Sequence, residues 1–411
     1  MNYMKYGLIA LLGAFLVGCG DDEGEDIVDD GSDDGGSFTN NEMVSDIVVN
    51  VSQSSAVVTW LVAANESNWT VEYGASGFEQ GTGTSGTDAD NLGPFGVSKI
   101  SGLTAGTGYD IYITVDGSSE TAFASFTTLG TDESVYYIHL DESTCTVDIE
   151  NTLGVTSSYT EDVNGTTRTI SINDIPSHRV GTFPTSADRR IGNPSSISEQ
   201  SNTYTMTTEP ALAGNSTTAQ GWVNGVLFSG VGIEVYTAES FTGFTGQTNR
   251  DWNRNALQSV DDLGLDCNNA HVQPTGQYHY HGLPSAYGGD LSVDGSEMVK
   301  IGYAADGFPY YYLYFEDDNG TIAVAEASYE LKSGDRGGNG ITAPSGNHDG
   351  EYFQDYEFVD GSGDLDECNG RFGPTPDAPN GEYYYVVTAD FPSFPLCFSG
   401  TPDGSFRFGP G

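Results

Sequence analysis

The sequence predicts a mainly β protein, in which a small N-terminal β-sandwich is followed by a larger β-rich domain with few short helices. Three observations predict this fold class. Aromatic residues, mostly Tyr and Phe, make up 12% of the chain and favour strands. Glycine occurs 55 times, as expected of a protein with many turns. Several segments alternate apolar and polar residues at the period of a strand. A chain of 411 residues is long enough for two or three domains.

Residues 1–18 predict a bacterial lipoprotein signal peptide. The apolar run 7–18, which follows Lys5, is too short to span a bilayer and is typical of a signal-peptide core. It ends in Leu-Val-Gly-Cys, which resembles a lipobox. We therefore expect an acylated Cys19 to anchor the mature chain to a membrane of the bacterial cell envelope, facing the periplasm or exposed at the cell surface. The alternative is a Cys that follows an ordinary cleavage site by chance.

Residues 19–40 predict a disordered acidic tether. Between residues 20 and 37 the chain consists almost entirely of Gly, Ser and nine acidic residues. Such a segment cannot bury enough apolar surface to offset the loss of chain entropy on folding. The formal net charge of the whole chain is −46, with only 13 basic residues. Nucleic acid is therefore excluded as a partner, because binding it requires a basic surface. The acidic balance suits solubility, a saline habitat or divalent cations.

Four cysteines remain once Cys19 is assigned to the lipid anchor. In an exported protein they predict two disulfide bonds. Three pairings are open, of which we favour Cys145 with Cys267 and Cys368 with Cys397. The chain contains no Cys-x-x-Cys pair, so the sequence indicates neither a thiolate zinc site nor a thioredoxin-like redox site.

Residues 41–130 predict the β-sandwich. The segments 56–60, 69–73, 109–115 and 124–129 alternate at the strand period between Gly-rich turns. This segment resembles a fibronectin type III domain: Trp60 stands where that family has its core Trp, and 103–109 is similar to its tyrosine corner, with Ala105 in place of Pro. The resemblance implies a spacer, or a module that binds a protein or glycan partner.

Residues 135–411 predict the larger β-rich domain. Its extended runs are 135–140, 167–172, 203–207, 297–303, 310–315 and 383–388. The dipeptide Asn224-Gly225 predicts a hairpin turn. One helix is expected over 251–262, with Asp251 as its N-cap. A weak internal repeat also appears, because 265–268 followed by 276–281 parallels 366–369 followed by 381–386.

The segment 277–282, Gln-Tyr-His-Tyr-His-Gly, carries the main candidate site. In a strand, successive side chains point to opposite faces, so Tyr278 and Tyr280 are expected on one face and His279 and His281 on the other. Residues two apart on a strand lie about 6–7 Å from each other at Cα. The two imidazoles can therefore bind one metal ion or one small ligand, and the Tyr face is expected to be buried.

These residues belong to an ordered set of motifs that resembles the YHYH domain family. The set comprises Ile-Pro-Ser-His at 175–178, Asn-Gly-Val at 224–226, residues 265–282, Ala-Asp-Gly-Phe-Pro at 305–309, His-Asp-Gly at 348–350 and 365–371. The resemblance covers 136–411 and implies no reaction, because the family has no established biochemical function.

Five of the six histidines lie in these motifs. We expect a transition-metal site for copper or zinc, because imidazoles suit both ions. Its expected ligands are His178, His271, His279, His281 and His348. Carboxylates that could accept hydrogen bonds from the imidazoles are Asp266, Glu234 and Asp349. The alternatives are a buried hydrogen-bonded network that specifies the fold, and acid–base catalysis without a metal.

Three functions follow from this set. The first is metal or small-ligand binding by a lipid-anchored extracytoplasmic protein. The second is adhesion or glycan binding, with Tyr-rich strands stacked on the ligand and structural histidines. The third is an extracellular metal-dependent hydrolase or oxidase, although the chain has no Gly-x-Ser-x-Gly or His-Glu-x-x-His motif. A calcium loop over 360–371 is a weaker expectation than a solvated acidic turn, because the EF-hand pattern has Leu365 in place of Gly and Arg371 in place of Glu.

Overall fold

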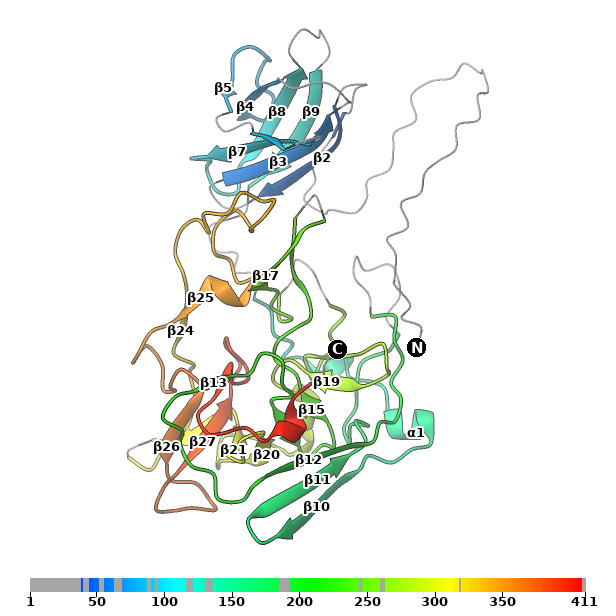
Figure 1. The fold of residues 1–411 in the computed structure, drawn as a ribbon, viewed down its shortest axis with the longest axis vertical. Helices are drawn as coiled ribbons and strands as arrows, with labels where there is room; N and C mark the ends of the chain where they lie inside the picture. The colour runs from blue at the N-terminus through cyan, green and yellow to red at the C-terminus, as the bar shows by residue number, and fades with distance from the viewer. Residues whose placement is uncertain are drawn as a thin grey trace. The chain divides into compact units, whose positions relative to one another are not determined.

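The protein is mainly β, as predicted, with several separate sheets (Figure 1). The structure, a computed structural model, describes residues 38–39, 44–51, 55–62, 69–86, 90–92, 95–115, 121–128, 130, 136–184, 193–243, 246–258, 263–317 and 319–408. The expected signal peptide, Cys19 and residues 19–37 of the expected tether lie outside these ranges. Two short α-helices occur in the described residues, α1 (Ile149–Leu153) and α2 (Ser285–Asp290).

The N-terminal part is a sandwich of two antiparallel sheets. The first has the order β1 (Phe38–Thr39), β9 (Thr121–Thr127), β8 (Gly108–Val115), β4 (Trp69–Ala75), β5 (Thr84–Ser85). The second has the order β2 (Val44–Val51), β3 (Ser55–Val62), β7 (Phe95–Ser101), β6 (Asp90–Leu92). If β2 is taken as strand A, the order β2-β3-β7-β6 corresponds to A-B-E-D and the order β4-β8-β9 to C-F-G, the strand orders known from immunoglobulin-like sandwiches; β1 and β5 are additional edge strands.

The core of this sandwich forms around Trp60, which is fully buried on β3. Its ring forms a T-shaped pair with that of Trp69, with the ring centroids 5.6 Å apart. The Tyr109 hydroxyl accepts a hydrogen bond from the backbone N–H of Thr104 at 2.9 Å. A Tyr at the start of a strand that bonds backbone a few residues upstream is the geometry of a tyrosine corner. Both features therefore have the local structure expected from the sequence.

An eight-stranded sheet organises the larger part. Its order is β18 (Ala270–Val272), β19 (Tyr278–Tyr280), β15 (Gly232–Ile233), β14 (Gly225–Leu227), β20 (Lys300–Ala304), β21 (Pro309–Tyr312), β27 (Glu382–Val387), β26 (Gly370–Gly373). The pairs β15–β19 and β21–β27 are parallel, and the other neighbours are antiparallel.

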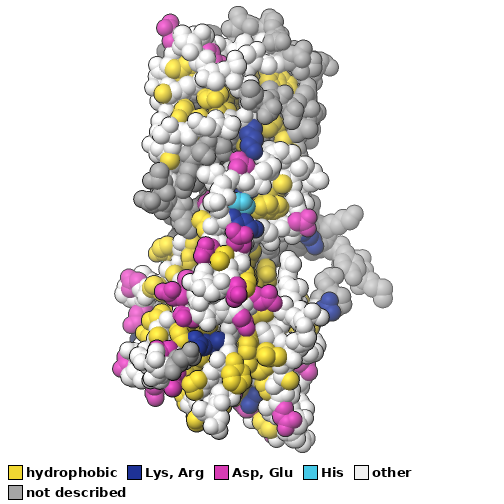
Figure 2. All heavy atoms as spheres, turned by 90° about the vertical axis from the view of Figure 1, so that its left-hand side faces the viewer, with side chains coloured by type: hydrophobic (Ala, Val, Ile, Leu, Met, Phe, Trp, Pro, Cys, Tyr) yellow, Lys and Arg dark blue, Asp and Glu magenta, His cyan; other side chains and the backbone are white. Residues whose placement is uncertain are grey.

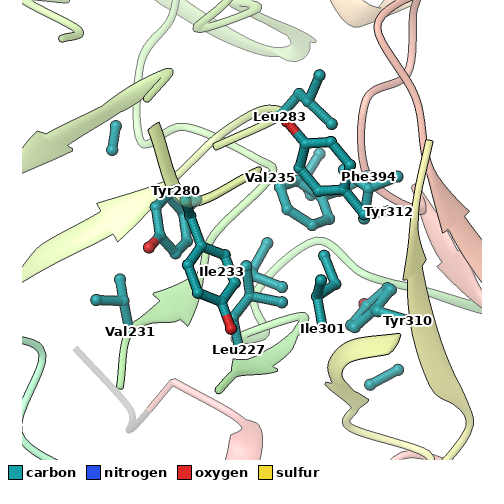
Figure 3. Packing of buried hydrophobic residues seen from close by; sticks show 14 of the residues in the cluster. Leu227, Val231, Ile233, Val235, Tyr280, Leu283, Ile301, Tyr310, Tyr312 and Phe394 are labelled. Carbon is teal, nitrogen blue, oxygen red and sulfur yellow. The ribbon is translucent and has the colours of Figure 1, made fainter. Parts of the chain in front are cut away.

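One face of this sheet is covered by the largest hydrophobic core. Tyr280 and Tyr310 lie among the aliphatic side chains of Leu227, Ile233 and Ile301 (Figure 3). Both tyrosines are fully buried. Burying rings of this size contributes much of the favourable free energy of folding, and each hydroxyl then requires a partner inside the protein.

Smaller sheets complete the described chain. They are β10 (Tyr159–Asn164), β11 (Thr167–Ile172) and β12 (Asn202–Thr207); β13 (Thr217–Thr218) with β28 (Cys397–Phe398); β16 (Ser240–Thr242) with β17 (Thr248–Asn253); β22 (Tyr314–Glu316) with β23 (Ile322–Val324); and β24 (Tyr329–Leu331) with β25 (Tyr356–Phe358). Short 3₁₀ turns are η1 (Glu142–Thr144), η2 (Phe353–Asp355) and η3 (Gly404–Phe406).

Two disulfides join Cys145 to Cys267 and Cys368 to Cys397, which confirms the favoured pairing. The bonds indicate an extracytoplasmic protein, because disulfides persist in oxidising compartments. Acidic side chains are spread over the face shown in Figure 2 rather than gathered in one patch. Within the described ranges, no helix is both long and apolar enough to cross a membrane.

Two local predictions are wrong. The helix expected over 251–262 is absent from its described residues, because β17 extends to Asn253 and the backbone N–H groups of Arg254 and Asn255 bond distant carbonyls. The dipeptide Asn224-Gly225 is not a hairpin turn. Gly225 lies within β14, and the Asn224 amide donates to the carbonyl of Pro395 at 2.8 Å. In both places tertiary hydrogen bonds override the local propensity.

Candidate metal centre

The side chains of the Tyr-His-Tyr-His segment alternate between two faces, as predicted. Tyr278 and Tyr280 on β19 point into the main core. His279 and His281 lie on the opposite face, where 1% and 4% of their surfaces are exposed. Burial this complete requires that each ring nitrogen has a partner or binds an ion.

His271 joins this pair from the neighbouring strand. In the antiparallel pairing of β18 with β19, His271 lies directly opposite His279, so the two side chains share a face. A tight turn sets this register: the N–H of Gln273 bonds the carbonyl of Gln277 at 2.8 Å, and Gly276 adopts φ 89°. Glycine accommodates this backbone conformation without steric cost.

The three imidazoles converge through their Nε2 atoms. Nε2 of His281 lies 3.1 Å from Nε2 of His279 and 3.1 Å from Nε2 of His271. All three atoms fall within 4.8 Å of one another. Tetrahedral Zn²⁺ with Zn–N bonds of about 2.0–2.1 Å holds its ligand nitrogens about 3.3 Å apart. The observed spacing therefore fits three ligands of one ion.

The opposite nitrogens determine which tautomer each ring adopts. The three Nδ1 atoms face backbone carbonyls, at 2.9 Å from Leu263 for His271, 3.4 Å from Gln277 for His279 and 3.3 Å from Val235 for His281. A carbonyl only accepts, so each Nδ1 carries the proton and each Nε2 presents a lone pair. Three lone pairs directed at one another repel, and a bound cation turns this repulsion into attraction.

Burial keeps the rings of His279 and His281 neutral. The pKa values of His279 and His281 are lowered well below the ordinary value of histidine, chiefly by desolvation and further by the neighbouring imidazoles. The neutral ring is the form that binds a metal ion. Burial thus prepares the side chains for coordination.

Glu234 supplies a carboxylate beside the triad. Its backbone N–H bonds the carbonyl of Tyr280 at 2.9 Å, which places the residue next to β19. Its Oε2 lies 3.8 Å from Nε2 of His279 and accepts from the Gln273 amide at 3.1 Å. Burial raises the pKa of Glu234 to about 7, partly offset by the Gln273 hydrogen bond. A cation at the three Nε2 atoms favours the ionised carboxylate, and Glu234 can then serve as a fourth ligand.

The structure places His178 away from the triad, which corrects the expected ligand set. His178 lies on the Tyr face of the sheet, where its Nε2 contacts the Tyr280 hydroxyl at 2.5 Å and its Nδ1 contacts the carbonyl of Arg179 at 2.8 Å. The Tyr280 hydroxyl also lies 2.8 Å from Oγ of Ser229. This is the buried polar network that the sequence left as an alternative, and it applies to His178 rather than to the triad.

His348 and Asp349 form a separate group. Nδ1 of His348 lies 3.0 Å from the Asp355 carboxylate, and Arg336 forms ion pairs with both Asp355 and Asp349. Neither residue belongs to the group of converging ligand atoms, so the structure does not support His348 as a ligand or Asp349 as a partner of the triad. The motif at 348–350 and the Tyr-His-Tyr-His segment were grouped by their resemblance to one family. Motifs grouped in this way can lie in different parts of a fold, because spacing in the sequence does not determine distance in space.

Asp266 also serves the Tyr face. Its carboxylate accepts from the Tyr278 hydroxyl at 2.8 Å and from the backbone N–H groups of Gly181 and Asn268 at 2.9 Å each. It therefore holds the strand in place and does not contact an imidazole of the triad. The actual partners of the Nδ1 atoms are carbonyls, which sequence patterns do not reveal because every residue has one.

The expected calcium loop gains no support. In the described part of the chain, two groups of His, Cys, Asp or Glu lie close enough to hold an ion. One is the His triad. The other is Glu367 with Cys368 and Cys397, whose sulfurs are joined in a disulfide and are not free to coordinate.

Known proteins show limited similarity to this chain. A family model described as "YHYH protein" matches residues 203–400, just under half of the chain, and supports the resemblance to that family. No curated protein matches the chain.

Two solved structures match parts of the chain. A protein from a study of the computer-based redesign of a β-sandwich is 21% identical, over 22% of this chain and 99% of that chain, with a TM-score of 0.19. The sensor domain of the anti-sigma factor RsgI4 of Pseudobacteroides cellulosolvens is 16% identical, over 21% of this chain and 77% of that chain, with a TM-score of 0.18. TM-scores this low assign no fold to the chain.

Proposed function

We propose that the segment similar to the YHYH family is a metal-binding domain, in which His271, His279 and His281 hold one transition-metal ion and Glu234 provides a fourth ligand. The observation that carries this proposal is the convergence of three Nε2 atoms, with both close separations at 3.1 Å, while every Nδ1 faces a carbonyl. A purely structural His cluster would pair donors with acceptors rather than direct lone pairs at one another.

Zinc and copper both fit the donor set. Three imidazoles with one carboxylate match the tetrahedral nitrogen and oxygen coordination of Zn²⁺. Imidazole nitrogen also suits Cu²⁺, whose intrinsic affinity for such ligands exceeds that of Zn²⁺. Titration of the metal-free protein with each ion, followed by measurement of the two dissociation constants at one pH, determines which ion the site prefers.

Elemental analysis of the protein purified without a His tag tests the proposal. We expect one transition-metal ion per chain in the wild type and none in His279→Ala/His281→Ala. His139→Ala is the matched control, because it removes a histidine outside the triad and should retain one ion. Equal metal content in the wild type and the double variant would refute the proposal.

A metal-dependent hydrolase or oxidase is a second candidate function. Catalytic zinc sites use three protein ligands and leave a position for water or substrate. Three imidazoles meet that requirement, and in this candidate function Glu234 would not bind the ion. A screen of extracellular polymers with and without a chelator tests it, and activity that survives chelation would exclude it. The glycan-binding alternative needs exposed Tyr rings, and Tyr278 and Tyr280 are fully buried.

We further propose that Cys19 is acylated and that residues 41–130 act as a fibronectin-like spacer between the membrane and the metal site. The lipobox-like sequence at 16–19 supports the anchor, and the strand order and tyrosine corner support the spacer. Labelling bacteria with a radioactive fatty acid should tag the wild-type protein, and Cys19→Ser should abolish the label. A labelled Cys19→Ser protein would contradict the anchor.

A further inference from the structure

The two halves of the eight-stranded sheet have the same plan. In chain order, the first half consists of β14, β15, β18 and β19, and the second of β20, β21, β26 and β27. From the centre outward, each half places its first, second, fourth and third strand in that order. The halves meet at the antiparallel pair β14–β20, in which Val226 lies opposite Tyr303.

The connecting turns repeat as well. After β14, the N–H of Leu227 bonds the carbonyl of Val231, and after β20 the N–H of Ala304 bonds the carbonyl of Phe308, at 3.0 and 2.9 Å. Each turn contains a glycine with positive φ, 82° at Gly230 and 90° at Gly307. The same hydrogen bond and the same backbone conformation thus recur at equivalent places.

The Tyr-face contacts agree residue by residue. Tyr278 donates to Asp266 at 2.8 Å in the first half, and Tyr383 donates to Asp366 at 2.8 Å in the second. The next Tyr of each strand bonds the turn residue before the glycine: Tyr280 contacts Ser229 at 2.8 Å, and Tyr385 donates to Asp306 at 2.6 Å. The internal repeat seen in the sequence therefore extends to four strands and both Tyr anchors.

This correspondence identifies the equivalents of the metal ligands. His271 lies opposite His279, and Arg371 lies opposite Tyr384 in the same register. The pairing of Ile233 with Tyr280 in the first half corresponds to the pairing of Tyr310 with Tyr385 in the second. Counted from these pairings, the equivalent residues are His271 and Arg371, His279 and Tyr384, His281 and Val386, and Glu234 and Tyr311.

The second group contains polar side chains among apolar neighbours; Tyr311 and Tyr384 are buried and Arg371 is half-buried. Tyr311 and Tyr384 are 1% and 0% exposed, and their rings lie 5.3 Å apart. The guanidinium of Arg371 lies 3.9 Å from the centre of the Phe315 ring, and Met298 and Leu365 belong to the same cluster. Among the described residues, the hydroxyls of both tyrosines and Nε of Arg371 have no hydrogen-bond partner. Buried polar atoms of this kind are rare in proteins and call for an explanation.

We infer that Arg371, Tyr384, Val386 and Tyr311 form a second, metal-free copy of the proposed metal centre, in which a guanidinium supplies the positive charge, and that restoring the ligands here creates a second metal site. The inference rests on the proposed function of the first copy. It follows from identical register, because ligand geometry on a sheet is set by which strand positions face each other. The class of ligand is a divalent transition-metal ion.

Grafting the ligands onto the full chain tests this inference. The graft is Tyr311→Glu, Arg371→His, Tyr384→His and Val386→His, and Zn²⁺ alone is the probe. After dialysis against Zn²⁺ and elemental analysis, we expect one ion per wild-type chain and two per grafted chain. A matched control carries the same changes except that Arg371 is kept, and it should bind one ion because the guanidinium repels the second.

The outcomes separate the inference from the proposed function. No ion in the wild type would refute the proposed function, whereas one ion in the wild type and one in a folded graft would refute only the inference.

If the graft does not fold, the reverse graft, which places the residues of the second group at the metal centre, tests the inference. It consists of Glu234→Tyr, His271→Arg, His279→Tyr and His281→Val. It should fold, bind no Zn²⁺ and show a thermal midpoint that chelator does not change. Failure of the reverse graft to fold, beside a folded His279→Ala/His281→Ala variant, would overturn the inference.

Discussion

At the residue scale, the two faces of strand β19 have different roles. Tyr280 lies in the core and contacts His178 and Ser229, while His279 on the opposite face belongs to the His triad. Alternation along a strand makes the two faces separable by mutation, because neighbouring side chains do not share contacts.

Replacement of Tyr280 by Phe should therefore reduce stability and leave metal binding intact. The change removes the hydroxyl that contacts Nε2 of His178 and Oγ of Ser229 and leaves two buried polar groups without a partner. We expect a loss of about 1–3 kcal/mol in the free energy of unfolding. Urea denaturation and metal content measured on the same sample check both parts. A loss of the ion in folded Tyr280→Phe would contradict the separation of the faces.

A buried acid also predicts how stability depends on pH. Asp174 is fully buried, and desolvation raises its pKa from 3.8 to about 7, although hydrogen bonds from Gly232 and Asn202 oppose the shift. Between pH 4 and 7 the folded protein thus holds a proton on Asp174 that the unfolded chain releases. The free energy of unfolding should fall as the pH rises through this window, by at most about 4 kcal/mol from this residue, and then level off.

Asp174→Asn should flatten this dependence, because the amide does not titrate. Asn is also suited to the backbone here, where φ is 51°, since it tolerates the left-handed region. Urea midpoints at several pH values between 4 and 8 measure the effect. An unchanged slope in the variant would show that other acids, such as Asp266 and Asp306, account for the pH dependence.

At the element scale, the two disulfides hold different parts of the large sheet. Cys267 precedes β18 and is bonded to Cys145, 122 residues away, whereas Cys368 precedes β26 and is bonded to Cys397, 29 residues away. Each bond therefore fixes the segment that leads into one outer hairpin, β18–β19 or β26–β27, and only the first hairpin carries the triad.

Removing the first disulfide should cost more stability than removing the second. Loop closure in the unfolded chain predicts losses of about 5 kcal/mol for Cys145→Ala/Cys267→Ala and about 3.5 kcal/mol for Cys368→Ala/Cys397→Ala. The first pair of substitutions should also weaken metal binding, because it frees the strand that carries His271. Unfolding curves and metal titrations of both variants test this order. Weaker metal binding in Cys368→Ala/Cys397→Ala but not in Cys145→Ala/Cys267→Ala would contradict this prediction.

At the scale of the whole molecule, metal binding should stabilise the fold. An ion present at 100 times its dissociation constant adds about 2.7 kcal/mol to the free energy of unfolding. For a domain of this size the thermal midpoint should rise by about 5–10 °C. Differential scanning calorimetry with Zn²⁺ and with excess chelator measures the shift. The variant His279→Ala/His281→Ala should show none, and an equal shift there would place the stabilising ion elsewhere.

The larger domain should also fold without the sandwich. The main core cluster, which includes Tyr280 and Tyr310, shares no residue with the cluster around Trp60. A domain with its own core can fold alone. Residues 135–411 expressed without the sandwich should therefore give a cooperative unfolding transition and bind one ion. A chain fragment that remains unfolded in the presence of Zn²⁺ would contradict this prediction.

Much of the site was within reach of sequence reasoning because it depends on a local rule. The alternation of Tyr278, His279, Tyr280 and His281 follows from the two-residue period of a strand, and the cysteine pairing agrees with the structure. The helix expected over 251–262 failed because its propensity was outweighed by tertiary hydrogen bonds, such as that from Asn255 to Glu351.

Local patterns in the amino-acid sequence were enough to predict that the protein is mainly β, that His279 and His281 share one strand face, and that four cysteines form two disulfides. Which distant residues meet depends on the three-dimensional fold. The fold brings His271 and Glu234 to His279 and His281 and places His178 and His348 elsewhere, because strand register and sheet order depend on packing across the whole molecule. Local periodicity fixes the direction of a side chain, whereas its partners come from contacts between segments far apart in the chain.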